Sequence, residues 1–328
     1  EIGFSLLKLC ALMVAFLTHI DFRNGNRIIF DVLDSSTAVI KQILLEMLHG
    51  AESDSHILKA AQISTNSIYM SHLPTNLAEL ICECMTNLQF TESSISDYDS
   101  GGGSSSYDKE SCMESLRKKC KELEHIFDRS RDLIFELVRE KADLLLAGME
   151  FIKWEPPSVN KGPNPYCEDL INYLRVTFMN LSSLPTDMRE AAHFTCMTHV
   201  CNSIMREMLS RKSCPSINIL GILNLSKDID ALIYFCEESG IPQLSQCFNK
   251  LSQILDIILK NDHEVILDPL RRSTEYPSLD IYDLVEVFEK YRNLSLASRI
   301  KNTVGDEVPQ LEHKVVKQFL ARLKEQLH

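Results

Sequence analysis

The feature that most constrains this chain is an apolar residue at every third or fourth position, sustained for about thirty residues after Glu110. The positions in this row are Leu116, Cys120, Leu123, Phe127, Ile134, Leu137 and Leu144. Such spacing places the side chains on one face of an α-helix, where they can pack against other helices. Ser130 and Lys141 interrupt the row where a two-stranded coiled coil would need apolar residues. The pattern therefore predicts one long amphipathic helix within a bundle.

Helical periodicity extends over nearly the whole chain. Glycine contributes only 11 of 328 residues, and no hairpin dipeptide separates alternating apolar runs, so signals for strands are essentially absent. The fold class expected is all-α. Helices are predicted over residues 4–19, 27–49, 54–71, 75–90, 111–150, 164–183, 187–211, 216–238, 241–260, 279–292 and 308–327.

Two segments interrupt the helices and suggest the domain organisation. Residues 91–111 are acidic and rich in Gly and Ser, with nothing to bury, which predicts a disordered loop. Residues 155–165 hold four prolines, which predicts a rigid linker and a boundary between two helical sub-bundles. The remaining parts are expected to be an N-terminal helical bundle portion over residues 1–90, a long helix over 112–154 and a C-terminal helical bundle over 166–328.

The net charge and the cysteine pattern indicate which kinds of partner and which cellular compartment are expected. The net charge of −12 argues against a nucleic-acid-binding protein, which needs a basic face to neutralise phosphates. The one apolar run long enough to suggest a membrane span, residues 4–20, is short and carries Lys8, so a buried helix is predicted instead. The 11 cysteines are odd in number and scattered, which favours reduced, mostly buried thiols in the cytoplasm.

No arrangement of residues predicts catalysis, a cofactor or a metal. His193, Cys196, His199 and Cys201 contain zinc-ligand residue types, but steps of three, three and two spread the side chains around a helix. They are interpreted as two buried thiols and two half-exposed imidazoles. An enzyme with a helical catalytic core would need clustered metal-binding carboxylates or histidines, and none is found, so the chain is not expected to be an enzyme.

The segment from Trp154 onward carries a resemblance to a known family. Trp154-Glu-Pro-Pro is followed by a Pro-Tyr entry at Pro165, by Asp-Leu-Ile-Asn-Tyr-Leu-Arg, by Leu184-Pro185, and by a helix rich in Ala, Cys and His up to Cys201. The order and spacing of these elements resemble the Sec-fifteen subunits of the exocyst. Further similar stretches are residues 217–236, 254–259, 267–272, 276–280 and 316–324.

This resemblance implies an elongated rod of antiparallel helical bundles, as in subunits of vesicle-tethering complexes. It implies a non-enzymatic exocyst subunit, cytoplasmic and peripheral at secretory vesicles and the plasma membrane, with other exocyst subunits as partners. It further implies that the C-terminal region binds a Rab-family GTPase in the GTP state. The alternative is another all-helical scaffold or tethering subunit without Rab binding.

The helix over residues 217–235 is where the resemblance suggests the GTPase contact. Many relatives have Asn where this chain has Ser226, a shorter side chain with fewer hydrogen-bonding groups. The alternative reading is that this helix is mostly bundle core. The candidate contact residues are Asn224, Ser226, Asp228 and Asp230.

Overall fold

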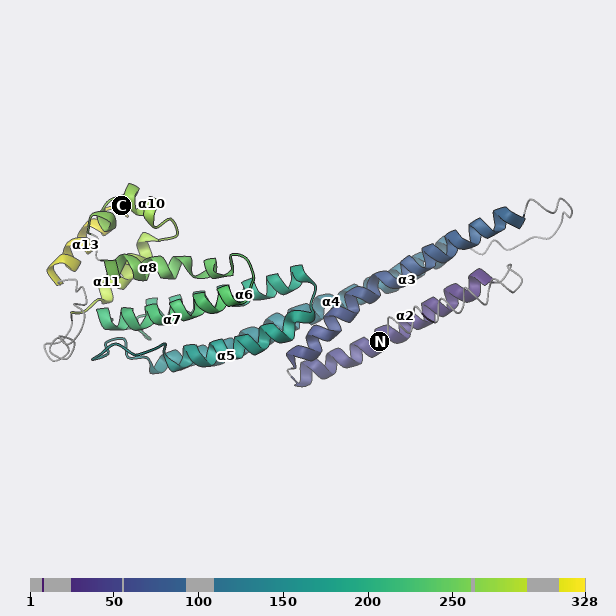
Figure 1. Ribbon diagram of the computed structural model, residues 1–328, viewed down its shortest axis with the longest axis horizontal. Coiled ribbons are helices and arrows are strands. Elements are labelled where there is room, and N and C mark those ends of the chain that lie inside the picture. Colours follow the sequence, from purple (N-terminus) through teal and green to yellow (C-terminus); the bar gives the residue numbers. More distant parts are fainter. Residues whose placement is uncertain are drawn as a thin grey trace. The chain divides into compact units, whose positions relative to one another are not determined.

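A computed structural model describes residues 8, 25–54, 56–92, 109–260, 263–293 and 313–327. Over these ranges the regular secondary structure is helical, and the one bridge between extended segments pairs Ile217 with Tyr291. The predicted all-α class is confirmed (Figure 1). The helix predicted over residues 4–19 lies outside the described residues, apart from Lys8, and so does most of the loop predicted over 91–111.

The described helices belong to two compact units. The first comprises residues 1–137 and 180–185, and the second comprises residues 138–179 and 186–328. This division falls within the long helix α4 (Lys109–Leu146), so that helix contributes to both units. The linker predicted over 155–165 lies wholly inside the second unit.

The first unit is built from α2 (Gly25–Asp54), α3 (Ile57–Glu92), the part of α4 up to Leu137, and the 3-10 turn η2 (Leu181–Ser183). Helix α2 buries a row of residues at three-to-four spacing, and α3 packs against it as a hairpin (Figure 1). Ion pairs join α2 to α4, among them Lys41 to Glu122 and Arg129 to Glu52. The buried row on α2 is Phe30, Leu33, Thr37, Ile40, Leu44, Leu48 and Ala51.

Helix α3 corrects one prediction. Separate helices over residues 54–71 and 75–90 were expected, yet Pro74, a residue type that normally ends a helix, lies inside one continuous helix. Met70 and Leu77 are buried on either side of it. The apolar packing of both halves compensates for the single backbone hydrogen bond that the proline removes.

The long helix follows its predicted register with two exceptions. Leu116, Leu123 and Ile134 are buried as expected, and Ser130 fits among them because its hydroxyl donates to the Phe127 carbonyl at 2.8 Å. Ile126, rather than Phe127, takes the buried position on its turn. The prediction for Leu144 is wrong, since that side chain is 65% exposed.

The second unit contains the end of α4 followed by a succession of helices with irregular segments between them. Figure 1 shows α5, α6, α7 and α8 alongside one another. Rings of Phe178 on α5 and Phe235 on α7 lie 5.4 Å apart, which confirms that these two helices are neighbours. The elements are η1 (Ala147–Phe151), α5 (Pro165–Asn180), α6 (Thr186–Leu209), α7 (Ile219–Glu238), η3 (Leu244–Phe248), α8 (Asn249–Lys260), α9 (His263–Leu267), α10 (Pro269–Glu275), α11 (Ile281–Lys290) and α13 (His313–Glu325).

Two of these helices, α9 and α10, were not predicted. Helix α10 has a recognisable start, because the Asp268 carboxylate accepts from the backbone N–H groups of Leu270 and Arg271, and Pro269 occupies the first turn. The Asp-Pro pair was therefore a usable signal. Both helices are too short for a periodic apolar pattern to reveal them.

Candidate functional site

Helix α7 carries a row of small and polar residues on one face. Asn218, Gly221, Asn224 and Asp228 follow one another at steps of three, three and four, which keeps them in one stripe along the helix. All four are buried, and the Asp228 side chain is completely so. The irregular segment over residues 152–164 lies on this stripe. We call the set of contacts between them the polar ladder.

The ladder begins at the first turn of α7. The Asn218 side chain caps the helix by accepting from the Gly221 N–H at 2.9 Å, while its backbone N–H donates to the Trp154 carbonyl at 3.2 Å. A Cβ atom at Gly221 would lie 2.1 Å from that same carbonyl oxygen. Only glycine therefore permits the segment to approach the helix this closely.

The middle of the ladder fixes the backbone of Asn160. Its N–H donates to Asn224 Oδ1 at 2.7 Å, and Lys227 Nζ donates to its carbonyl oxygen. The Asn160 side chain in turn donates to Asn164 Oδ1 at 2.9 Å. The backbone N–H and carbonyl groups of Asn160 are thus both hydrogen-bonded by side chains from α7.

The ladder ends at Asp228. Its carboxylate accepts from the Asn164 backbone N–H at 2.6 Å, the Asn164 side-chain amide at 2.8 Å and the Tyr166 hydroxyl at 2.9 Å. Burial raises the pKa of Asp228, and the three hydrogen bonds oppose that rise. Burial, and next the nearby Asp228 carboxylate, raise the pKa of Tyr166 well above its ordinary value. The carboxylate therefore anchors the entry to α5.

The structure separates the four candidate contact residues into two groups. Asn224 and Asp228 are buried in the ladder and bind the chain's own backbone, which matches the alternative reading of this helix as bundle core. Ser226 is half-buried and Asp230 is exposed. The pKa of Asp230 is raised by partial burial and by the neighbouring Asp256.

The ladder itself was missed by the sequence reasoning, although a signal was present. Asn218, Asn224 and Asp228 stand at three-to-four spacing within an otherwise apolar run. Polar residues on the buried face of a helix need partners, and a proline-rich segment has backbone groups that need them too. The polar residues of the buried helix face and the proline-rich segment together would have suggested that one hydrogen-bonds the other.

The histidines and cysteines of α6 lie as follows. His193 is only 3% exposed, and its ring contacts that of Phe178 at an interplanar angle of 41°, with ring centroids 3.7 Å apart, so the expectation of a half-exposed imidazole is wrong for this residue. His199 is half-buried, with Nε2 2.7 Å from Asp143 Oδ1. Burial raises the pKa of Cys196 and of Cys201 to about 12. In the described ranges, no three potential ligands converge on a point where a metal could bind.

Fold and ladder together define an all-helical scaffold whose buried polar groups hold its own irregular segments in place. Among the helices that the structure describes, none combines the length and apolar composition needed to cross a bilayer. The family described as "Exocyst complex subunit Sec15 C-terminal" matches residues 7–290. The chain belongs to this family.

The chain is also similar, at low sequence identity, to individual exocyst subunits. Exocyst complex component SEC15B of Arabidopsis thaliana is 20% identical over 174 residues, covering 51% of this chain and 22% of the relative. Exocyst complex component 6 of Caenorhabditis elegans is 28% identical over 133 residues, covering 39% of this chain and 16% of the relative. The chain therefore spans less than a quarter of the length of these curated relatives.

Among solved structures, the chain is similar to one titled "Structure of Myo2-GTD in complex with Mmr1". The TM-score is 0.44 at 11% identity, over 97% of this chain and 72% of that one. A "Myosin V cargo binding domain" gives a TM-score of 0.39 at 11% identity, over 88% of this chain and 85% of that one. At these TM-scores the likeness carries no argument about function.

Proposed function

We propose that the chain is part of a non-enzymatic exocyst subunit that tethers secretory vesicles at the plasma membrane, and that its second unit binds a GTP-loaded Rab GTPase. Membership of the Sec15 family carries the first part. Other exocyst subunits are the expected partners, and the expected location is cytoplasmic and peripheral at the two membranes.

The outward face of α7 supports the second part. Ser226 lies two residues from both Asn224 and Asp228, and two residues turn about 200° around an α-helix. Ser226 therefore faces away from the ladder, and Asp230 and Tyr234 continue the same outward stripe at four-residue steps. An exposed tyrosine beside a carboxylate is a suitable centre for a protein interface. The proposed contact thus comprises Ser226, Asp230 and Tyr234.

Binding of the 328-residue chain to a panel of Rab GTPases, each loaded with GTP or GDP, tests this proposal. We expect GTP-selective binding that Asp230→Ala and Tyr234→Ala each weaken about tenfold. Tyr282→Ala is the matched control, because Tyr282 is an equally exposed tyrosine on α11. If neither Asp230→Ala nor Tyr234→Ala weakens binding, this face of α7 is excluded as the GTPase contact. No binding to any Rab by a folded chain would favour a scaffold without Rab binding.

A further inference from the structure

An apolar groove lies where η1 and the 152–164 segment meet the start of α5, within the second unit. Its volume is about 570 Å³, and its apolar lining includes Leu144, Phe151, Ile152 and Pro165. Phe151 is 84% exposed and Leu144 is 65% exposed. Large apolar side chains this exposed on the lining of one hollow are typical of a surface that a partner covers.

The floor of the groove is fixed by the ladder. Tyr166 and Asn164 both line the groove, and both donate to the buried Asp228 carboxylate. Gly148 brings η1 against α5, since a Cβ atom there would lie 3.0 Å from Tyr166 Cβ. A preformed floor reduces the entropy that a ligand must pay on binding.

Charge at the rim selects the ligand. Glu150 and Asp169 line the groove and both are exposed, and within the described residues no ion pair joins either carboxylate to a basic side chain. Two unpaired carboxylates beside apolar side chains favour a cationic, partly apolar ligand and repel phosphate groups. A second hollow, which Ala147 and Glu150 also line, differs because its lining includes Arg206, Lys212, Glu207 and Asp143.

We propose that this groove binds an amphipathic helix of a partner protein, with apolar residues at three-to-four spacing flanked by Lys or Arg. The apolar anchors would fill the space between Leu144 and Phe151, and the basic residues would pair with Glu150 and Asp169. The groove uses none of Ser226, Asp230 and Tyr234. It is therefore a second interaction surface, independent of the proposed GTPase contact.

Model peptides test the proposal on the 328-residue chain. The probes are two fluorescent amphipathic peptides of roughly 18 residues, one of leucine and lysine and the other of leucine and glutamate. We expect the lysine peptide to bind at least about tenfold more tightly than the glutamate peptide. The pair Leu144→Ser with Phe151→Ser should weaken the lysine peptide about tenfold. Leu270→Ser is the matched control, since Leu270 is 79% exposed on α10.

A charge exchange makes the test specific to the rim. Glu150→Lys with Asp169→Lys should invert the preference, so that the glutamate peptide binds more tightly than the lysine peptide. Circular dichroism confirms that each variant is folded. The proposal is overturned if neither peptide binds, if the two bind equally, or if the Leu144 and Phe151 substitutions leave binding unchanged. Concentration-dependent self-association abolished by those same substitutions would instead assign the groove to a second copy of the chain.

Discussion

The two compact units satisfy their buried polar groups in different ways. In the first unit the buried polar side chains are hydroxyls. Those of Thr37, Ser71 and Ser130 bond back to their own helix, as Thr37 does to the Leu33 carbonyl at 2.6 Å, whereas the buried Ser67 hydroxyl has no partner within the described residues. In the second unit they include amides and charged groups that reach other segments. Lys290, for example, is buried and donates to the Met208 carbonyl at 3.1 Å, and burial lowers its pKa.

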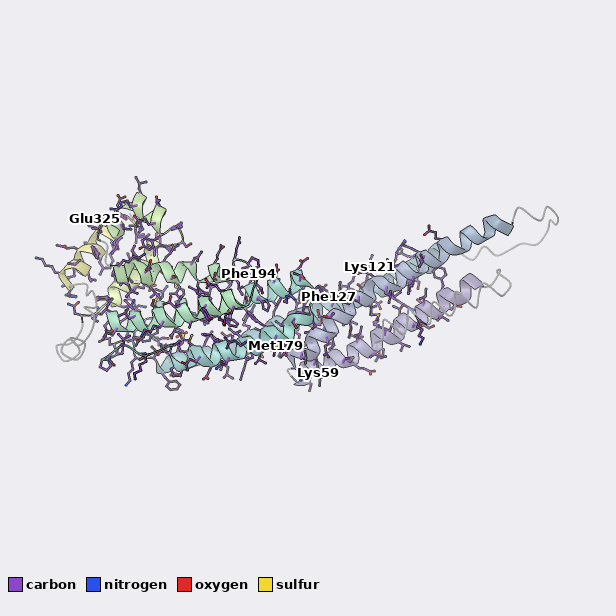
Figure 2. The ribbon with its side chains drawn as sticks, in the orientation of Figure 1. Lys59, Lys121, Phe127, Met179, Phe194 and Glu325 are labelled. Atoms are coloured by element: carbon purple, nitrogen blue, oxygen red, sulfur yellow. The ribbon has the colours of Figure 1, made fainter. Side chains whose placement is uncertain are left out.

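This difference follows from the regularity of the backbone. Helices satisfy almost all of their own N–H and C=O groups, so the helix contacts of the first unit need only apolar side chains and peripheral ion pairs. The second unit, whose side chains are drawn in Figure 2, packs irregular backbone against its helices: the backbone groups of Trp154, Asn160 and Asn164 are hydrogen-bonded to α7 or its cap. Those groups require partners, and Asn224, Asp228, Lys290 and Arg272 supply them.

The largest expected effect comes from removing the acceptor at the end of the ladder. Asp228→Ala leaves three donors from Asn164 and Tyr166 without a partner, and should lower the free energy of unfolding of the second unit by about 3–5 kcal/mol. Urea unfolding followed by fluorescence of Trp154, the single tryptophan, measures it. The exposed Asp230→Ala should change it by less than about 0.5 kcal/mol. Equal stability of the two variants would refute the ladder's role.

Acid should weaken the second unit through His193. Burial, and next Arg189, lower the pKa of this imidazole from 6.5 to about 4. Between these values the unfolded chain binds more protons than the folded one, so stability falls as pH falls, by about 3 kcal/mol in total. His193→Leu should remove this part of the pH dependence, measured by urea unfolding at several values between pH 7 and pH 4. An unchanged slope would mean that the pKa of His193 is not lowered in the folded chain.

Alanine substitutions at two glycines should change the stability of the two units in opposite directions. A methyl group at Gly221 meets the Trp154 carbonyl, so Gly221→Ala should destabilise the second unit by about 2 kcal/mol. Gly50 lies inside α2 with no neighbour within 4 Å of its added Cβ, so Gly50→Ala should stabilise the first unit by about 0.5–1 kcal/mol. Thermal unfolding by circular dichroism gives both values. Effects of the same sign would contradict this contrast between the two helices.

The smallest effect concerns the surface ion pairs of the first unit. Arg129 Nη2 lies 2.6 Å from Glu52 Oε1, but the two side chains are 50% and 35% exposed. Arg129→Ala should therefore cost only about 0.5 kcal/mol, and the loss should vanish in about 1 M salt. Unfolding in low and high salt checks this. If Arg129→Ala lowers the free energy of unfolding by more than about 2 kcal/mol, these surface ion pairs contribute as much as the buried polar groups of the second unit.

The sequence predicted the helices well where the apolar pattern was long, as over Leu116 to Ile134. It failed at Pro74, where tertiary packing outweighs a local helix-breaking signal, and at Leu144, which continues the pattern but lies exposed at the groove. The candidate contact residues lie on α7, the helix that also carries the ladder. Which of its residues face inward was not predicted.

What the sequence determined by itself was the all-α class, because helical periodicity is a property of residues three and four apart. It also carried the order of motifs that places the chain in its family. Only the tertiary structure decided that Asn224 and Asp228 serve the ladder, since the Asn160 backbone that Asn224 binds lies 64 residues away. A polar residue in an apolar run shows that a partner is needed, but the fold alone supplies that partner.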